Sequence, residues 1–103
     1  MYNAPLIRID EEDVAFILGK CYRYFSAILK GTYCNTCQIR HTCRITDYVI
    51  YLDDSNDIII DGCCENCASS IHRCIETGEK IGLGERAEIT WMVKVDLLGQ
   101  RAA

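Results

Sequence analysis

The sequence has little proline and no long apolar run, and both absences narrow the class of protein. Its one proline is Pro5, and no segment combines glycine, serine and proline in the manner of a linker. No stretch approaches the roughly 18 consecutive apolar residues of a membrane-spanning helix. For a chain of 103 residues we therefore expect one domain, residues 1–103, that does not associate with membranes.

The N-terminal segment also lacks a basic stretch followed by an apolar one, which is the pattern of a secretory signal. We therefore expect a cytoplasmic setting, in which thiols stay reduced. In that setting the eight cysteines favour metal binding over a disulfide framework, although an even number of cysteines would also suit disulfides.

Basic residues are too few and too scattered for an evident nucleic-acid surface. Eleven Lys and Arg stand against fifteen Asp and Glu, so the formal net charge is −4. The basic residues form only two small patches, Arg40 to Arg44 and Lys20 to Lys30, and neither is the long stripe that phosphate binding requires. Nucleic-acid binding is therefore the alternative function, not the favoured one.

Residues 11–30 are predicted to form one long helix. Asp10 supplies the N-cap before an acidic first turn, and Gly31 supplies the stop signal. Apolar side chains recur every three to four residues, at Val14, Ile17, Leu18, Cys21, Phe25, Ile28 and Leu29. This stripe predicts a buried face, in which Cys21 is a small core residue.

Two CxxC pairs bracket a predicted β-hairpin. The β-rich runs 47–52 and 58–60 are separated by turn residues at 53–57. A two-residue spacer lets both sulfurs of a tight turn point at one ion, and Zn²⁺ takes four such ligands at about 2.3 Å. The predicted cofactor is therefore Zn²⁺, and the predicted ligands are Cys34, Cys37, Cys64 and Cys67.

The remaining segments complete an α+β prediction. Residues 66–76 are predicted to form a short helix with two metal ligands at its start, and Gly78 is its stop signal. Apolar and polar residues then alternate along 86–98, which predicts a half-buried C-terminal strand.

This order of helix, knuckle, hairpin, helix and strand resembles a treble-clef zinc finger over about residues 33–77. The resemblance implies that a first knuckle supplies Cys34 and Cys37, and that the next helix supplies Cys64 and Cys67 from its first turn. It implies a metal and a topology but no activity, because modules of many functions share this architecture. A zinc ribbon, with both knuckles at hairpin tips, is the alternative, and the predicted helix after Cys67 favours the treble clef.

The other cysteines leave several assignments open. On a helix Cys74 would lie about 10 Å beyond Cys67, which predicts a core residue and not a ligand. Cys63 adjoins Cys64, and Cys43 or His41 is near enough in sequence to replace a knuckle cysteine. Each CxxC is followed by a His-x-Cys, so a second metal site and an iron–sulfur cluster also stay open.

Four thiolates around one ion favour a closed structural site, so we do not expect an enzyme. The favoured function is binding to another protein, as an adaptor, regulator or inhibitor, and small size is compatible with a phage or mobile-element origin. Expected contact residues are the aromatics Tyr22, Tyr24 and Tyr51 and the last strand, where Met92 and Leu98 could also recruit a second copy. Iron–sulfur and redox functions are less favoured alternatives.

Overall fold

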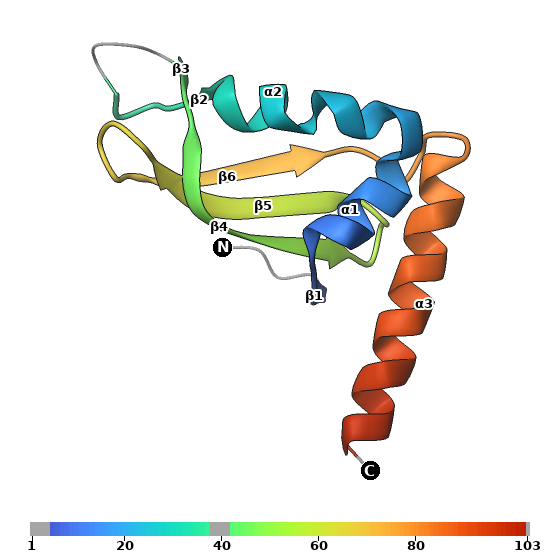
Figure 1. Ribbon diagram of the computed structural model, residues 1–103. Helices are drawn as coiled ribbons and strands as arrows, with labels where there is room; N and C mark the ends of the chain where they lie inside the picture. The colour runs from blue at the N-terminus through green and yellow to red at the C-terminus, as the bar shows by residue number, and fades with distance from the viewer. Residues whose placement is uncertain (1–4, 38–41, 103) are drawn as a thin grey trace.

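A four-stranded antiparallel sheet forms the middle of the fold in the computed structural model, which describes residues 5–37 and 42–102 (Figure 1). The strands, in their order across the sheet, are β1 (Leu6–Ile9), β4 (Ile45–Asp53), β5 (Ile58–Cys64) and β6 (Ser70–Ile75). The predicted hairpin is confirmed as β4 and β5, whose register pairs Leu52 with Ile58 across the turn. The predicted α+β class is likewise confirmed.

The predicted helix 11–30 is present as three consecutive helical pieces. They are α1 (Glu11–Leu18), the 3₁₀-helix η1 (Gly19–Tyr24) and α2 (Phe25–Lys30). The predicted N-cap at Asp10 is confirmed, and Asp13 adds the reciprocal bond that makes a capping box at the start of α1. The interruption occurs at Gly19, whose φ of 55° ends the α-helical hydrogen bonding. The change of helical period after Gly19 turns Cys21 outward, so the prediction that Cys21 is buried is wrong.

The predicted strand 86–98 is wrong, because this segment belongs to the helix α3 (Leu83–Ala102). The β-branched residues of segment 86–98 alternate as they would in a strand. In a helix, however, the four-residue spacing of Leu83, Ala87 and Trp91 places them on one face against the core. Packing against α1 therefore overrides the local preference for a strand. Within residues 5–37 and 42–102, neither α3 nor any other helix has the length and hydropathy to cross a membrane.

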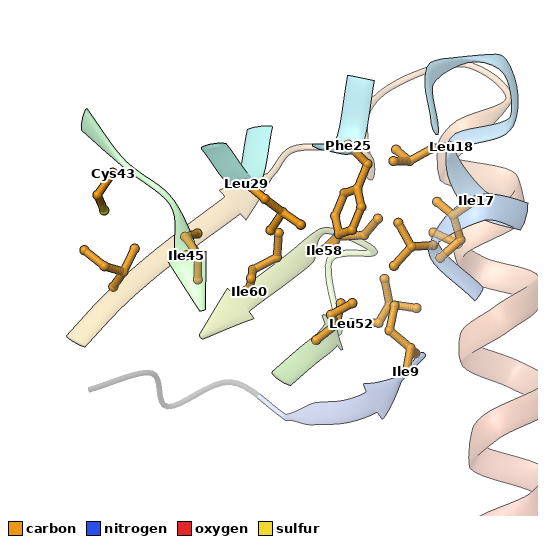
Figure 2. Packing of buried hydrophobic residues seen from close by; sticks show 14 of the residues in the cluster. Ile9, Ile17, Leu18, Phe25, Leu29, Cys43, Ile45, Leu52, Ile58 and Ile60 are labelled. Carbon is orange, nitrogen blue, oxygen red and sulfur yellow. The ribbon is translucent and has the colours of Figure 1, made fainter. Parts of the chain in front are cut away.

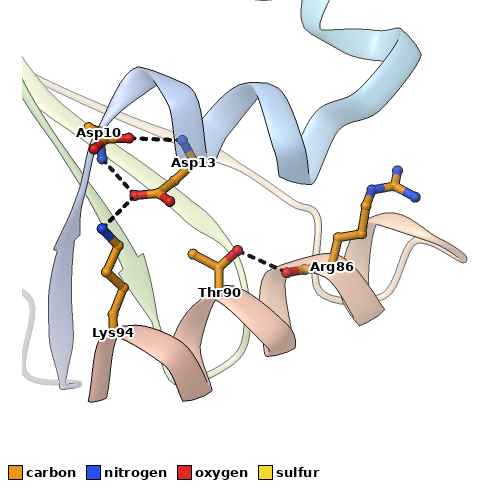
Figure 3. Close-up of polar contacts among 5 residues, drawn as sticks. All are labelled: Asp10, Asp13, Arg86, Thr90 and Lys94. Atoms are coloured by element: carbon orange, nitrogen blue, oxygen red, sulfur yellow. Dashed lines mark hydrogen bonds and ion pairs between the residues drawn. The ribbon is translucent and has the colours of Figure 1, made fainter. Parts of the chain in front are cut away.

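Two contacts hold α3 against α1, and a third stabilises α3 itself. The Arg86 guanidinium donates from Nε to the carbonyl oxygen of Ile17, over 3.1 Å. The ammonium of Lys94 lies 3.1 Å from a carboxylate oxygen of Asp13, and Thr90 donates to the carbonyl of Arg86 (Figure 3). Beyond these contacts α3 extends away from the sheet (Figure 1).

The predicted helix 66–76 is also wrong, because residues Ser70–Ile75 form β6. Pairing with β5 forms backbone hydrogen bonds along one side of β6, and it places Ile71 opposite Gly62 with its side chain buried. As a result the treble-clef arrangement is not confirmed, since the element that comes directly after Cys67 is the strand β6 and not a helix. Cys74 is exposed on β6, which corrects the prediction of a core residue.

The core lies between one face of the sheet and the helical pieces above it (Figures 1 and 2). The sheet contributes Ile58, Ile60 and Leu52, none of which is exposed to solvent. Ile17 and Phe25 close the same core from above, and Leu29 and Cys43 continue it toward the cysteine end of the sheet (Figure 2). The two-stranded pair β2 (Thr32–Tyr33) and β3 (Thr42–Cys43) completes that end.

Replacing Gly19 with alanine is expected to lower the free energy of unfolding by about 1–3 kcal/mol, because a positive φ strains a residue that has a Cβ. The added Cβ would also lie 3.1 Å from a guanidinium nitrogen of Arg86. Chemical denaturation measures the change. The control Lys20→Ala alters an exposed neighbour and should stay within about 0.5 kcal/mol of the parent. Equal stabilities of the two variants would contradict this account of the helix break.

Candidate metal centre

The first CxxC segment is positioned by the end of α2 and by β2. Gly31 ends α2, and the Thr32 hydroxyl donates to the carbonyl of Ile28 over 2.8 Å, which ties β2 to the helix. Cys34 follows directly after β2. Because Thr32 pairs with Cys43 across the two-stranded sheet, Cys43 lies beside the start of this segment.

The second CxxC segment is the connection between β5 and β6. The amide of Ala68 donates to the carbonyl of Cys64 over 2.8 Å, and the amide of Cys64 donates to the carbonyl of Ser69 over the same distance. Ala68 has a φ of 61°, which closes this turn tightly. The turn therefore brings Cys67 back toward Cys64, at the end of the strand.

Pairing of β4 with β5 joins the two segments. Ile45 lies opposite Cys64, so the residue two positions earlier, Cys43, is carried to the same end of the sheet. The amide of Glu65 donates to the carbonyl of Arg44 over 2.9 Å, which fixes this approach. Residues distant in sequence thus meet through ordinary strand pairing.

Five cysteine sulfurs gather here as two overlapping triads. Within each triad all sulfurs lie within 4.8 Å of one another, and the triads share Cys64: Cys34, Cys43 and Cys64 form the first, and Cys37, Cys64 and Cys67 the second. The sulfurs of Cys34 and Cys67, one from each triad, are 3.5 Å apart. Four of the five cysteines are buried, and Cys67 is exposed. Each triad can hold a metal ion.

The geometry and chemistry fit a thiophilic ion such as Zn²⁺. Bonds of about 2.3 Å to four thiolates place tetrahedral sulfurs about 3.8 Å apart. The sulfurs of each triad, which lie within 4.8 Å of one another, therefore need only small shifts to bind one ion. The side-chain amide nitrogen of Asn66 lies 3.8 Å from the sulfur of Cys37. The Ser69 hydroxyl lies 3.2 Å from the sulfur of Cys67. Such outer contacts orient ligand sulfurs.

Burial and neighbouring thiols set the acidities of these cysteines. Burial raises the pKa of Cys43 to about 12, and the adjacent sulfur of Cys64 adds to the increase. Burial raises the pKa of Cys34 as well, with a further increase from Cys67. For Cys64 burial acts in the same direction. Hydrogen bonds from the Cys43 thiol and from the backbone amides of Cys67 and Asn66 outweigh that effect and lower its pKa to about 6. Cys64 therefore loses its proton more readily than Cys34 or Cys43, and the thiolate is the metal-binding form.

The four predicted ligands are among these five residues, and their role as ligands stays a prediction. The sequence indicates Cys43 only as a possible replacement for a knuckle cysteine, because strand pairing that joins positions 43 and 64 cannot be read from local spacing. Cys63 belongs to neither triad. Adjacent residues of a strand point to opposite faces, which explains why Cys64 and not Cys63 faces the other sulfurs.

The other open assignments have different outcomes. His41 and Arg40 lie outside the described residues. In the part of the chain that is described, no group of three or more ligand side chains includes His72 or Cys74. The ring Nδ1 of His72 lies 2.5 Å from a carboxylate oxygen of Asp61 on the neighbouring strand. The repeated His-x-Cys pattern therefore provides no second site among these residues.

Comparisons with known proteins add no family to this description. No protein-family model, no curated protein and no solved structure matches the chain.

Zinc stoichiometry provides the first test of the centre. The parent protein should bind one Zn²⁺ per chain, measured by native mass spectrometry, and Cys64→Ser should lose it, because Cys64 belongs to both triads. Loss of the metal should also lower the midpoint of thermal unfolding, since metal binding contributes to folding free energy. The matched controls Cys21→Ser and Cys74→Ser change exposed cysteines outside the triads and should keep the ion. Retention of zinc by Cys64→Ser would contradict the assignment.

Proton release provides a second test. At pH 7 a group with a pKa of about 6 is mostly deprotonated, so zinc binding should release fewer protons than there are ligating thiols. At pH 5 Cys64 is protonated as well, and one further proton should appear. Calorimetric titrations in buffers of different ionisation enthalpy measure both numbers. Equal release at the two pH values would contradict the lowered pKa of Cys64.

Proposed function

We propose that the chain is a small zinc-binding protein with a structural zinc centre, and that its function is to bind another protein as an adaptor, regulator or inhibitor. Two features support this proposal: sulfurs that can fill every position around one ion, and a helix that exposes apolar side chains. The sulfurs support the zinc centre, and the exposed helix supports the proposal that the chain binds another protein.

A closed centre is supported by the number and burial of the sulfurs. A catalytic zinc site normally has three protein ligands and one open position, whereas five sulfurs gather here. Both CxxC segments connect paired strands, β2 with β3 and β5 with β6. This arrangement favours the zinc-ribbon alternative over the treble clef. Zn²⁺ is the proposed ion, because four cysteine thiolates around one ion are typical of structural zinc sites.

The apolar residues of α3 support a protein-binding surface. Leu83, Ala87 and Trp91 pack against the body, whereas the rest of the helix presents large apolar side chains to solvent. Those side chains are between 43% and 63% exposed: Ile89, Met92, Val93, Val95 and Leu97. We call these five residues the α3 surface. Several neighbouring exposed apolar residues on one helix are typical of an interaction site.

Charge around the α3 surface indicates the chemistry of its partner. Glu85, Glu88 and Asp96 are exposed along the helix. The two basic residues of 83–97, Arg86 and Lys94, are directed to α1 instead. The α3 surface therefore suits an apolar groove with a basic rim on a different protein. A second copy of this acidic chain would bring like charges together, and four thiolates around zinc would add two further negative charges.

The tyrosines and the C-terminal residues named from the sequence contribute less to this surface. Of the three tyrosines only Tyr24 is largely exposed, at 53%, and its ring lies beneath the Arg23 guanidinium. Tyr22 is packed on Phe25, with ring centroids 5.8 Å apart, and Tyr51 is half-buried. Met92 belongs to the α3 surface. The side chain of Leu98 lies outside the described ones.

Binding of nucleic acid is the second candidate, and charge disfavours it. The acidic excess opposes a phosphate backbone, and the described part of the Arg40 to Arg44 patch is Arg44 alone. Titration with duplex and single-stranded DNA at two salt concentrations measures this alternative directly. Binding that weakens steeply with salt would favour it over the protein-partner proposal.

The α3 surface is tested with a double variant, Val93→Glu and Leu97→Glu, which places charge among the apolar side chains. A partner captured from native cells and then purified should bind the parent at least about 10-fold more tightly than the variant, a difference of about 1.4 kcal/mol. The matched control, Ser26→Glu with Ala27→Glu, adds the same two negative charges at exposed positions on α2.

Sedimentation equilibrium of the parent distinguishes a partner from a second copy, and a monomer is expected. A dimer that the α3 variant abolishes would assign the surface to self-association. Equal binding of the purified partner by parent and variant would remove α3 from the interface.

A further inference from the structure

The five sulfurs of the centre are not equivalent. The pairs Cys34–Cys64 and Cys64–Cys67 each lie within 4.8 Å, as members of the two triads, and Cys34 and Cys67 are 3.5 Å apart. These three sulfurs therefore form a mutually adjacent set. Cys43 lies within 4.8 Å of Cys34 and Cys64, and Cys37 lies within 4.8 Å of Cys64 and Cys67. Each of the two outer sulfurs is thus near two members of the central set.

A tetrahedral zinc ion binds four thiolates, so one of five must be left out. We propose that Cys34, Cys64 and Cys67 are the constant ligands of the zinc centre, and that Cys37 and Cys43 alternate at the fourth position. This inference rests on the zinc centre of the proposed function. It adds Cys43 as a ligand and gives the centre two interchangeable ligand sets.

The two alternating cysteines come from different kinds of backbone. Cys43 is held in β3, opposite Thr32, and its side chain is 4% exposed. Cys37 is 6% exposed, belongs to the connection that follows β2, and has the Asn66 amide beside its sulfur. The two side chains are almost equally buried, so burial does not favour either cysteine as the fourth zinc ligand.

Exchange between the two sets conserves charge and protons. As the Cys43 thiol loses its proton and binds zinc, the Cys37 thiolate leaves zinc and takes up a proton. The ion keeps four thiolates throughout. The consequence is local: with Cys43 bound, the Cys34–Cys37 turn is attached to zinc through Cys34 alone, and the Cys37 thiol becomes available for reaction.

A double-mutant cycle tests the exchange. Cys37→Ala and Cys43→Ala should each retain one Zn²⁺ with less than about 10-fold loss of affinity, because the other cysteine takes the fourth position. The double variant has only three thiolates. Its affinity should fall more than about 100-fold below either single variant, since even outer-shell partners are worth about 10–100-fold. The control Cys37→Ala with Cys63→Ala should behave as Cys37→Ala alone.

Substitution with Co²⁺ gives a spectroscopic readout of the same cycle. Both single variants should retain the visible absorption of a four-thiolate Co²⁺ site, and the double variant should show that of a three-thiolate site. A three-thiolate spectrum for Cys37→Ala alone would overturn the proposal, as would full affinity and spectrum in the double variant. A parent protein that binds neither Zn²⁺ nor Co²⁺ would instead overturn the zinc centre itself.

Alkylation of the zinc-loaded parent keeps the test independent of whether a variant folds. Iodoacetamide should first label the exposed Cys21 and Cys74, and then Cys37, in molecules that still carry zinc. Peptide mapping together with native mass spectrometry measures both labels and metal. If every molecule labelled at Cys37 has lost its zinc, Cys43 does not replace Cys37 and the proposal fails.

Discussion

Antiparallel pairing between β4 and β5 determines which cysteines of this chain can meet. The register places Ile45 opposite Cys64, so β3 and the end of β5 lie at one end of the sheet. The β2–β3 pairing then adds the segment that begins with Cys34, and the turn before β6 adds Cys67. Cys43 and Cys64 lie on paired strands, whereas Cys34, Cys37 and Cys67 lie on the connections next to those strands. A metal ion among these sulfurs would therefore join the two CxxC segments and β3, which strand pairing has already brought together.

The core connects the cysteine centre at one end of the sheet with α3 at the other (Figure 1). Ile58 and Ile60 of β5 pack under Phe25 and Leu29, while the same strand continues to Cys64 (Figure 2). At the far end of the helical layer, Asp13 and the carbonyl of Ile17 hold α3 in place. A rigid core would let a metal-stabilised body present α3 as an exposed apolar helix. Loss of metal would then weaken the body while leaving the residues of the α3 surface unchanged.

Local signals in the sequence predicted the parts of the fold that depend on local physics. The N-cap at Asp10, the stop at Gly31 and the hairpin turn after Asp53 are all present, because side chains close in sequence determine them. The sequence predicted a helix where β6 lies and a strand where α3 lies. The apolar pattern of each segment suits either structure, and packing against residues distant in sequence selects the one that forms. The same limit applies to the site: spacing identified two CxxC pairs, whereas Cys43 joins them only through the register of two sheets.

The central claim is that the gathered cysteines form one closed thiolate centre for a single zinc ion. X-ray absorption spectroscopy of the purified protein at the zinc edge measures this most directly, because it reports the type, number and distance of the ligands. The account predicts four sulfur neighbours at about 2.3 Å and no second metal nearby. Oxygen or nitrogen in the first shell would contradict the closed centre, and an iron spectrum with a short metal–metal distance would replace zinc with an iron–sulfur cluster.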